Sequence, residues 1–340
     1  MPVGADWTSR EQMLGYPDGI HPEKYVKQAA LNLILEARMP ENEKKPYFLI
    51  LDEMNLSHVE RYFSDFLSAI ESDEAIPMHE VEGGLDGVPH RLKLPDNLFV
   101  IGTVNVDETT YMFSPKVLDR ANVIEFRVAE EDFDAFLEDP KKINLDALCE
   151  DGVGLGEEYG PLLVDAAKED VTPTELADVH DDLRRELGVL FRIFKAYNWE
   201  FGYRVGKEVS RFVYFHRQLS GDGWEFEAAL DAQIVQKLMP KLNGSEDRLR
   251  TILMALAWYS SGLIEIPEAN EEEKANELKG YYNRICDLAV KAVKNAPTDT
   301  PDKLLEKLGE TEPRYPMAFD KTVRMWKAVK LNGFTSFAEN

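Results

Sequence analysis

Positive charge is scarce in this 340-residue chain, which has 39 lysines and arginines against 63 aspartates and glutamates and a formal net charge of −24. That imbalance repels phosphate backbones and argues against broad passive nucleic-acid binding, although a local loop could still contact DNA. Cysteine is scarcer still: Cys149 and Cys286 cannot build a disulfide framework, which fits a reducing cytoplasm. No apolar run approaches the roughly 18 to 20 residues of a membrane span, and the N-terminus lacks the pattern of a signal peptide. We therefore expect a cytoplasmic protein without a membrane partner.

The negative charge is concentrated in one part of the chain. Residues 129–182 hold 18 acidic residues and three basic ones, a net charge of −15, and the rest of the chain carries only −9. A hydrophobic content of 44% is ample for buried cores, and a length of 340 residues suggests two domains. The break in charge predicts a boundary between residues 1–128 and 129–340.

The two predicted domains differ in their periodicity. The first alternates helices and strands, as a parallel α/β domain does, with helices at 22–38 and 59–71, buried strands at 47–53, 97–103 and 123–128, a β-hairpin insertion at 76–95 and a short helix opening at Ser114-Pro115. Its first 19 residues are polar and rich in turn signals. The second is predicted to be an all-α lid, with helices at 130–138, 157–169, 173–196, 201–219, 224–240, 245–263, 268–295, 301–309 and 318–331.

Two adjacent carboxylates end the strand at 47–53. Four apolar residues followed by Asp52 and Glu53 form the Walker B arrangement of P-loop nucleoside triphosphatases. There Asp52 would hold the hydration shell of Mg²⁺ and Glu53 would polarise the attacking water. An ordinary strand ending in solvated acids is the structural alternative.

The strand at 97–103 is followed by Asn105, about 50 residues downstream of the acidic pair. In the AAA+ class this position is sensor 1, where an asparagine aims the lytic water at the γ-phosphate. A turn-forming asparagine is the alternative reading.

Several segments resemble the AAA+ motor subunits of McrB-type restriction systems. The resemblance is dense at 47–57 and 97–126, weak at 129–195, and is also seen at 6–10, 14–16, 201–205 and 236–244. It implies a partial AAA+ core followed by a large helical lid, with Arg120 as the arginine finger and Arg204 as sensor 2. The alternative for Arg120 is a surface ion pair with Asp119 or a helix-capping contact. The alternative for Arg204 is an exposed residue on a helix. Asp107 and Glu108 are candidates for coupling neighbouring subunits, or are simply solvated loop carboxylates.

The same resemblance implies a ring, expected to be a hexamer, that hydrolyses ATP or GTP with Mg²⁺ at subunit interfaces and drives a nuclease subunit in DNA restriction or defence. McrB itself carries Asn-Thr-Ala-Asp at the sensor strand, whereas this chain has Asn-Val-Asp-Glu from Asn105 onward, so GTP preference is doubtful and ATP is plausible. Target recognition lies in separate domains of that family, so DNA is expected to be contacted only indirectly or through a local loop.

No Gly-x-x-x-x-Gly-Lys-Ser/Thr sequence occurs in the 340 residues. We therefore expect either the C-terminal part of a nucleoside triphosphatase, inactive by itself, or a non-catalytic AAA+ remnant that acts as a scaffold. A protein-remodelling chaperone of the MoxR or dynein-related branch is a further alternative. The hairpin at 76–95, with His79, His90, Arg91 and Lys93, is either a pore or DNA-facing loop or a plain insertion.

Overall fold

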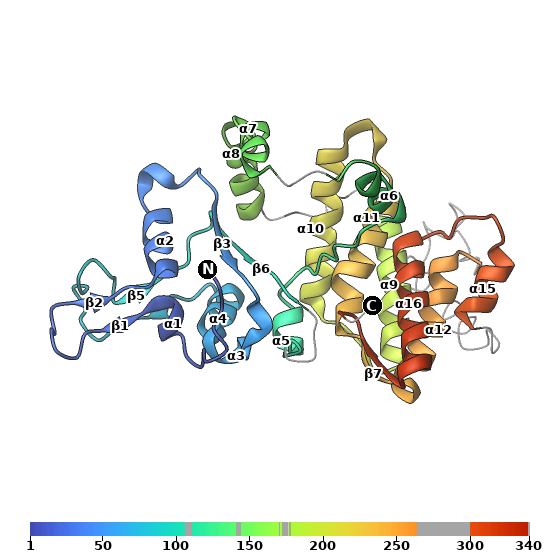
Figure 1. Ribbon diagram of the computed structural model, residues 1–340, viewed down its shortest axis with the longest axis horizontal. Coiled ribbons are helices and arrows are strands. Elements are labelled where there is room, and N and C mark those ends of the chain that lie inside the picture. The colour runs from blue at the N-terminus through green and yellow to red at the C-terminus, as the bar shows by residue number, and fades with distance from the viewer. Residues whose placement is uncertain are drawn as a thin grey trace, which may run out of the picture. The chain divides into compact units, whose positions relative to one another are not determined.

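The computed structural model describes residues 1–105, 111–140, 144–169, 171, 176, 178–263 and 300–338. The chain divides into two compact units (Figure 1). Unit 1 contains Met1–Arg120 and Glu125–Glu169, and unit 2 contains Ala121–Ile124 and Asp170–Asn340. The division therefore falls after residue 169 instead of at 128, and much of the acidic segment belongs to the first unit.

Unit 1 is built on a parallel pair of strands, β3 (Tyr47–Leu51) and β6 (Leu98–Gly102). Tyr47 lies opposite Leu98 and Leu51 opposite Gly102, so both strands end at the same level. The first residues of the chain run along the other side of β3, where the Val3 N–H donates to the Asp52 carbonyl at 2.9 Å. The strands predicted at 47–53 and 97–103 are confirmed as a parallel pair, and the chain as a whole is mixed α/β.

The helices beside this sheet are shorter than predicted. The helix expected at 22–38 is only α2 (Ala29–Ala37), because Tyr25 lies in β2 (Tyr25–Val26), which pairs antiparallel with β1 (Tyr16–Pro17) after α1 (Glu11–Leu14). A short 3₁₀ turn, η1 (Pro40–Asn42), follows α2. The helix expected at 59–71 breaks into α3 (Val59–Tyr62) and α4 (Ser64–Ser72), and a 3₁₀ turn, η2 (Met54–Leu56), precedes it. Ile70 on α4 is half exposed.

The predicted hairpin at 76–95 has only a short ladder. β4 (Ile76–Pro77) pairs antiparallel with β5 (Arg91–Leu92), and the tip turns at Asp86 and Gly87, both of which have positive φ. The short helix predicted after Ser114 is confirmed as α5 (Pro115–Leu118).

The strand predicted at 123–128 is wrong. The structure assigns no strand to these residues, and Phe126 is 93% exposed. The Val123 N–H donates to the carbonyl of Gln236 at 2.9 Å, a bond within unit 2, and the segment joins no sheet. A segment rich in β-branched residues forms a strand only where a neighbouring strand can pair with it and a surface can pack against it.

Three helices complete unit 1: α6 (Glu130–Glu138), α7 (Leu145–Asp151) and α8 (Leu155–Lys168). The first matches its prediction, the second was not predicted, and the third is close to its predicted range. Helix α8 is attached to the unit through Gly160, which lies against Pro46, and through an ion pair of Lys168 with Glu43 at 3.3 Å.

Unit 2 is mainly helical, as predicted for the second half of the chain. Its elements are α9 (His180–Ala196), α10 (Tyr203–Ser220), η3 (Gly221–Gly223), α11 (Phe226–Gln233), the π-helical turn η4 (Ile234–Leu238), η5 (Met239–Lys241), β7 (Asn243–Ser245), α12 (Glu246–Ser261), α15 (Pro301–Leu308), α16 (Pro316–Asn332) and β8 (Phe334–Ser336). The antiparallel pair β7–β8 was not predicted. The helix predicted at 268–295 lies outside the described residues. No helix in the described parts of the chain has the length and apolar character needed to cross a membrane.

Among the described residues of unit 2, two carboxylates are buried. Glu186 on α9 accepts hydrogen bonds from the Tyr259 hydroxyl at 2.6 Å and from Arg314 at 2.9 Å. Asp231 on α11 accepts from the N–H groups of Met317 and Ala318, both at 2.8 Å. Those N–H groups belong to the first turn of α16, where backbone N–H groups have no acceptor within the helix. Asp231 therefore caps α16 from a different element.

Candidate functional site

The predicted acidic pair lies at the exposed end of β3. Leu49 and Leu51 bury one face of the strand, and Asp52 and Glu53 follow in solvent. Glu53 has φ of 54° and ψ of 48°, a left-handed conformation that non-glycine residues rarely adopt. Such a conformation is energetically costly and is found preferentially at functional sites. It turns the chain sharply into η2 as soon as the strand ends.

Thr103 joins the two strand ends. Its hydroxyl donates to Asp52 Oδ1 at 2.7 Å and accepts the Glu53 N–H at 2.9 Å. The backbone also closes here, because the Met54 N–H donates to the Thr103 carbonyl at 2.8 Å. No role was predicted for Thr103. The signal available in the sequence was its position as the last residue of the strand predicted at 97–103, and the structure places it level with Asp52.

Asn105 contacts the second carboxylate of the pair. Its Nδ2 donates to Glu53 Oε1 at 3.1 Å, and its own carbonyl accepts a bond from the side chain of Asn55 at 2.9 Å. The structure therefore brings Asp52, Glu53 and Asn105 together at one edge of the sheet. Asn55, which supports Asn105 from η2, was not singled out in the sequence.

Arg120 lies just after α5 and is largely buried. Its guanidinium forms an ion pair with Glu71 on α4 and donates to the carbonyl of Lys116. Helix α5 is in turn attached to α3, because the Ser114 N–H donates to Glu60 at 2.9 Å. Burial alone would raise the pKa of Glu60, but the hydrogen bonds from Ser114 outweigh it, and the pKa lies below its usual value. The predicted alternatives for Arg120 were a surface pair with Asp119 or a helix-capping contact. The bond to the carbonyl of Lys116 is a contact of the second kind, at the end of α5, and the ion pair with Glu71 was not predicted.

Arg204, the predicted sensor 2, lies in the first turn of α10 in unit 2 and is partly exposed. The segment 236–244 contributes a different basic residue that the sequence did not single out. Lys237 on η4 is buried, forms an ion pair with Glu208 and donates to the carbonyl of Ala121 at 3.0 Å. Lys237 thus holds the chain directly after Arg120, within unit 2.

Two of the basic residues of the hairpin, His79 and Lys93, are engaged locally. His79 is buried, accepts the Val81 N–H at 3.2 Å on Nδ1, and directs Nε2 at the carbonyl of Val88, 3.0 Å away. Lys93 pairs with Asp73 at 2.8 Å. His79 therefore stabilises the hairpin itself, which favours a plain insertion over a contact loop at this residue. Asp107 and Glu108 lie outside the described residues.

The oxygen groups at the end of β3 fit a hydrated divalent cation. Mg²⁺ is held in proteins by one or two carboxylates together with waters and substrate phosphates, and the exposed Asp52 beside Glu53 and the Thr103 hydroxyl meets that requirement. Within the described ranges no group of three or more His, Cys, Asp or Glu side chains is placed to hold a metal by itself.

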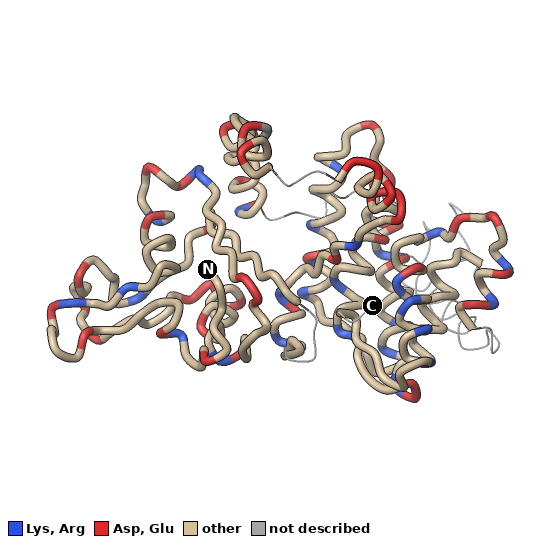
Figure 2. Tube along the Cα trace, viewed as in Figure 1, with Lys and Arg blue, Asp and Glu red and all other residues tan. Residues whose placement is uncertain are grey.

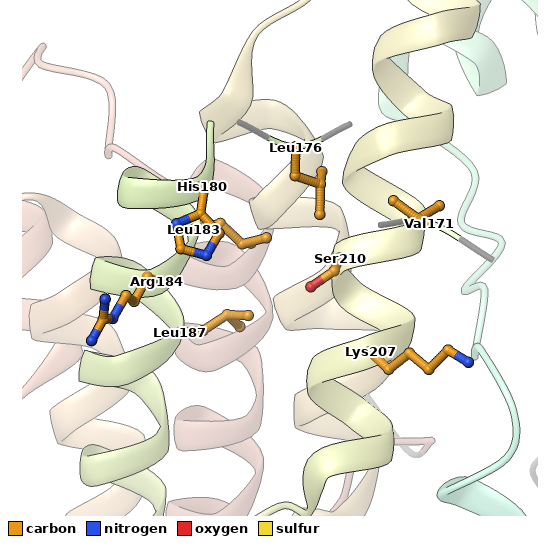
Figure 3. A pocket seen from close by; sticks show the side chains of 8 residues that line it. All are labelled: Val171, Leu176, His180, Leu183, Arg184, Leu187, Lys207 and Ser210. Atoms are coloured by element: carbon orange, nitrogen blue, oxygen red, sulfur yellow. The ribbon is translucent and has the colours of Figure 1, made fainter. Parts of the chain in front are cut away.

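A separate hollow of about 280 Å³ lies in unit 2 between α9 and α10. Leu183 and Leu187 face it from α9 and Ser210 from α10, while His180 and Arg184 lie at its rim (Figure 3). None of the predicted site residues lines it.

Comparison with known proteins finds one family. No curated protein and no solved structure matches the chain. The profile of a family described as Domain of unknown function (DUF8727) matches residues 164–334, half of the chain. The matched range includes Arg204 and Lys237 and excludes Asp52, Glu53, Asn105 and Arg120. The chain belongs to the DUF8727 family.

Proposed function

We propose that this chain is part of a AAA+ nucleoside triphosphatase and that the edge formed by Asp52, Glu53 and Asn105 is its hydrolytic site. The observation that carries the proposal is the hydrogen bond from Asn105 to Glu53, 3.1 Å long, across the ends of two parallel strands. Ligand sites of open parallel sheets lie at the carboxyl ends of the strands, which is where these groups converge.

Each group has a distinct task in this proposal. Asn105 holds Glu53 Oε1, which leaves Oε2 free to accept a proton from an attacking water. Thr103 holds Asp52 through Oδ1, and Oδ2 would be available to the hydration shell of a bound Mg²⁺. The cation would neutralise charge on the transferring phosphoryl group of ATP or GTP. The left-handed backbone at Glu53 fixes the direction of its side chain relative to the strand.

Arg120 and Arg204 complete the proposal. As an arginine finger, Arg120 would leave Glu71 and reach the phosphate of a neighbouring subunit, a role that suits a permanently charged planar group. Arg204 would sense the phosphate from the helical unit. The proposed assembly is a homo-oligomeric ring, a hexamer, that drives a nuclease subunit of an McrBC-like defence system and contacts DNA only indirectly or through a local loop.

Replacing Glu53 with glutamine tests the hydrolytic site. In the intact nucleoside triphosphatase, glutamine at position 53 keeps an oxygen that can accept from Asn105 but cannot take a proton from water. Phosphate release from Mg²⁺-ATP or Mg²⁺-GTP by that intact protein should therefore fall by about 100-fold or more while nucleotide binding persists. Glu74→Gln is the matched control, because Glu74 is an exposed carboxylate that follows α4. Equal phosphate release by wild type and Glu53→Gln, above a protein-free blank, would refute the role of Glu53.

A non-catalytic AAA+ scaffold is the second candidate. Two observations favour it: the 340 residues contain no Gly-x-x-x-x-Gly-Lys-Ser/Thr, and the guanidinium of Arg120 is already paired with Glu71. Sedimentation velocity with and without Mg²⁺-ATP separates the candidates. A scaffold assembles without nucleotide and releases no phosphate, whereas the enzyme requires turnover that depends on Glu53.

A further inference from the structure

The segment around α6 exposes large apolar side chains in close succession. Phe126 and Val128 are 93% and 74% exposed, and Phe133, Phe136 and Leu137 are 52%, 52% and 57% exposed. Single exposed apolar residues are common on protein surfaces, but contiguous groups of them mark interaction sites. No residue of α6 is buried.

Three of these side chains share one face of the helix. Phe133, Phe136 and Leu137 follow the i, i+3, i+4 spacing that places residues side by side on a helix surface, and we call them the α6 stripe. Ala135 lies on the opposite face and is also exposed. This is the pattern of an amphipathic helix that binds with its apolar face in a groove.

Apart from Ala135, the rest of α6 is acidic. Glu130, Glu131, Asp132, Asp134 and Glu138 surround the α6 stripe, and the helix has no basic residue. Figure 2 shows this concentration of acidic positions along the helix. The acids in the first turn favour the helix through its dipole, but a nine-residue helix with no buried residue is only marginally stable alone. A groove that covers the stripe would supply the packing that α6 lacks among the described residues.

We propose that the α6 stripe is a docking element for a partner protein with an apolar groove rimmed by lysine and arginine. The charge around the stripe selects this occupant. Nucleic acid and anionic lipid surfaces are repelled by five carboxylates, and helices that lie in membrane interfaces carry basic polar faces instead. Two copies of α6 facing each other would bring ten carboxylates together, which opposes self-association through this face. The proposal is independent of the proposed nucleotide chemistry.

Photo-crosslinking in the full chain tests the occupant. Benzoylphenylalanine is placed at Phe133, and at Ala135 as the matched control on the opposite face, in cells of the source organism, and the crosslinked peptides are sequenced by mass spectrometry. The expected result is a crosslink from position 133, and not from 135, to a segment of another protein whose surface is apolar with flanking lysine or arginine. Crosslinks within the chain or to a second copy, equal crosslinking from both positions, or no crosslink would overturn the proposal.

Titration with the crosslinked partner, purified, gives the second readout. Phe133→Ala with Phe136→Ala should weaken binding at least tenfold, and replacing Glu130, Glu131 and Asp134 with their amides should weaken it and flatten its salt dependence. Ala135→Ser should leave the affinity unchanged. Because Phe133 and Phe136 are exposed and alanine favours a helix, the circular dichroism spectrum of the double phenylalanine variant should not change. Unchanged affinity in the double phenylalanine variant, or an affinity insensitive to both charge and salt, would refute the proposed contact.

Discussion

Asp231 offers a direct test of how unit 2 is held together, because one buried carboxylate caps a distant helix. Burial raises the pKa of Asp231 to about 6, against the opposing effect of the two N–H groups from α16. In an unfolded chain the pKa of an aspartate is about 4. The folded state therefore holds the proton more tightly than the unfolded state, and the protonated form contributes stability at low pH that is lost as the pH rises through about 6.

The magnitude follows from the two pKa values. One pKa unit corresponds to about 1.4 kcal/mol, so protonated Asp231 stabilises the folded state by up to about 3 kcal/mol at low pH. About 1.4 kcal/mol of that stabilisation is lost between about pH 5 and about pH 7.5. Asp231→Asn removes the titration and also one of the two acceptors for the α16 N–H groups. The lost hydrogen bond costs about 1 to 3 kcal/mol and does not depend on pH. The advantage of wild type over Asp231→Asn should therefore shrink by about 1.4 kcal/mol between these pH values.

Urea unfolding followed by tryptophan fluorescence measures this difference, because four of the five tryptophans, at 199, 224, 258 and 326, belong to unit 2. The matched control is Asp320→Asn on α16, since Asp320 is exposed and pairs with Arg324 at 2.8 Å. Its difference from wild type should stay constant with pH. Parallel pH curves for wild type and Asp231→Asn would refute the reasoning that burial dominates the titration of this carboxylate.

Two further substitutions test buried and interstrand hydrogen bonds. Thr103→Val keeps the shape of the side chain but removes the hydroxyl bound to Asp52, and should lower the free energy of unfolding by about 1 to 2 kcal/mol in urea titrations; no change would contradict the bridging role. Tyr259→Phe removes the donor to the buried Glu186 and should cost about 1.5 to 3 kcal/mol, whereas Tyr203→Phe, at a fully exposed tyrosine, should cost nothing measurable. Equal stability of the two phenylalanine variants would contradict the importance of the Glu186 contact.

The convergence of Asp52, Glu53 and Asn105 could be predicted because strands that run parallel end at the same edge of a sheet. Two continuous apolar runs, each followed by polar residues, were enough to identify that edge. The left-handed turn at Glu53 could not be predicted, since nothing in the local sequence requires it. Thr103 was overlooked because its role depends on the strand register, which aligns Leu51 with Gly102 and so places Thr103 beside Asp52.

The failed prediction at 123–128 has a different origin. Its apolar, β-branched residues resemble those of the two strands that did form, yet the segment hydrogen-bonds to the carbonyl of Gln236 in a helical unit. Strand formation depends on an available neighbour, and local sequence contains no information about that neighbour. The break in charge at residue 128 misplaced the division between units for a related reason, because α8 is attached to unit 1 through Pro46 and Glu43, far back in the chain.

The sequence by itself determined the elements whose signals are local. These are the two parallel strands, the carboxylates that follow β3, most of the described helices of unit 2, and the acidic, amphipathic sequence of α6. Only the tertiary structure decided which partners those elements found. Arg120 with Glu71, Lys237 with Ala121, and Asp231 with the first turn of α16 are pairs 49, 116 and 86 or more residues apart in sequence. Periodicity and propensity act over a few residues, whereas these contacts arise when separate elements pack and each buried polar group must find a partner.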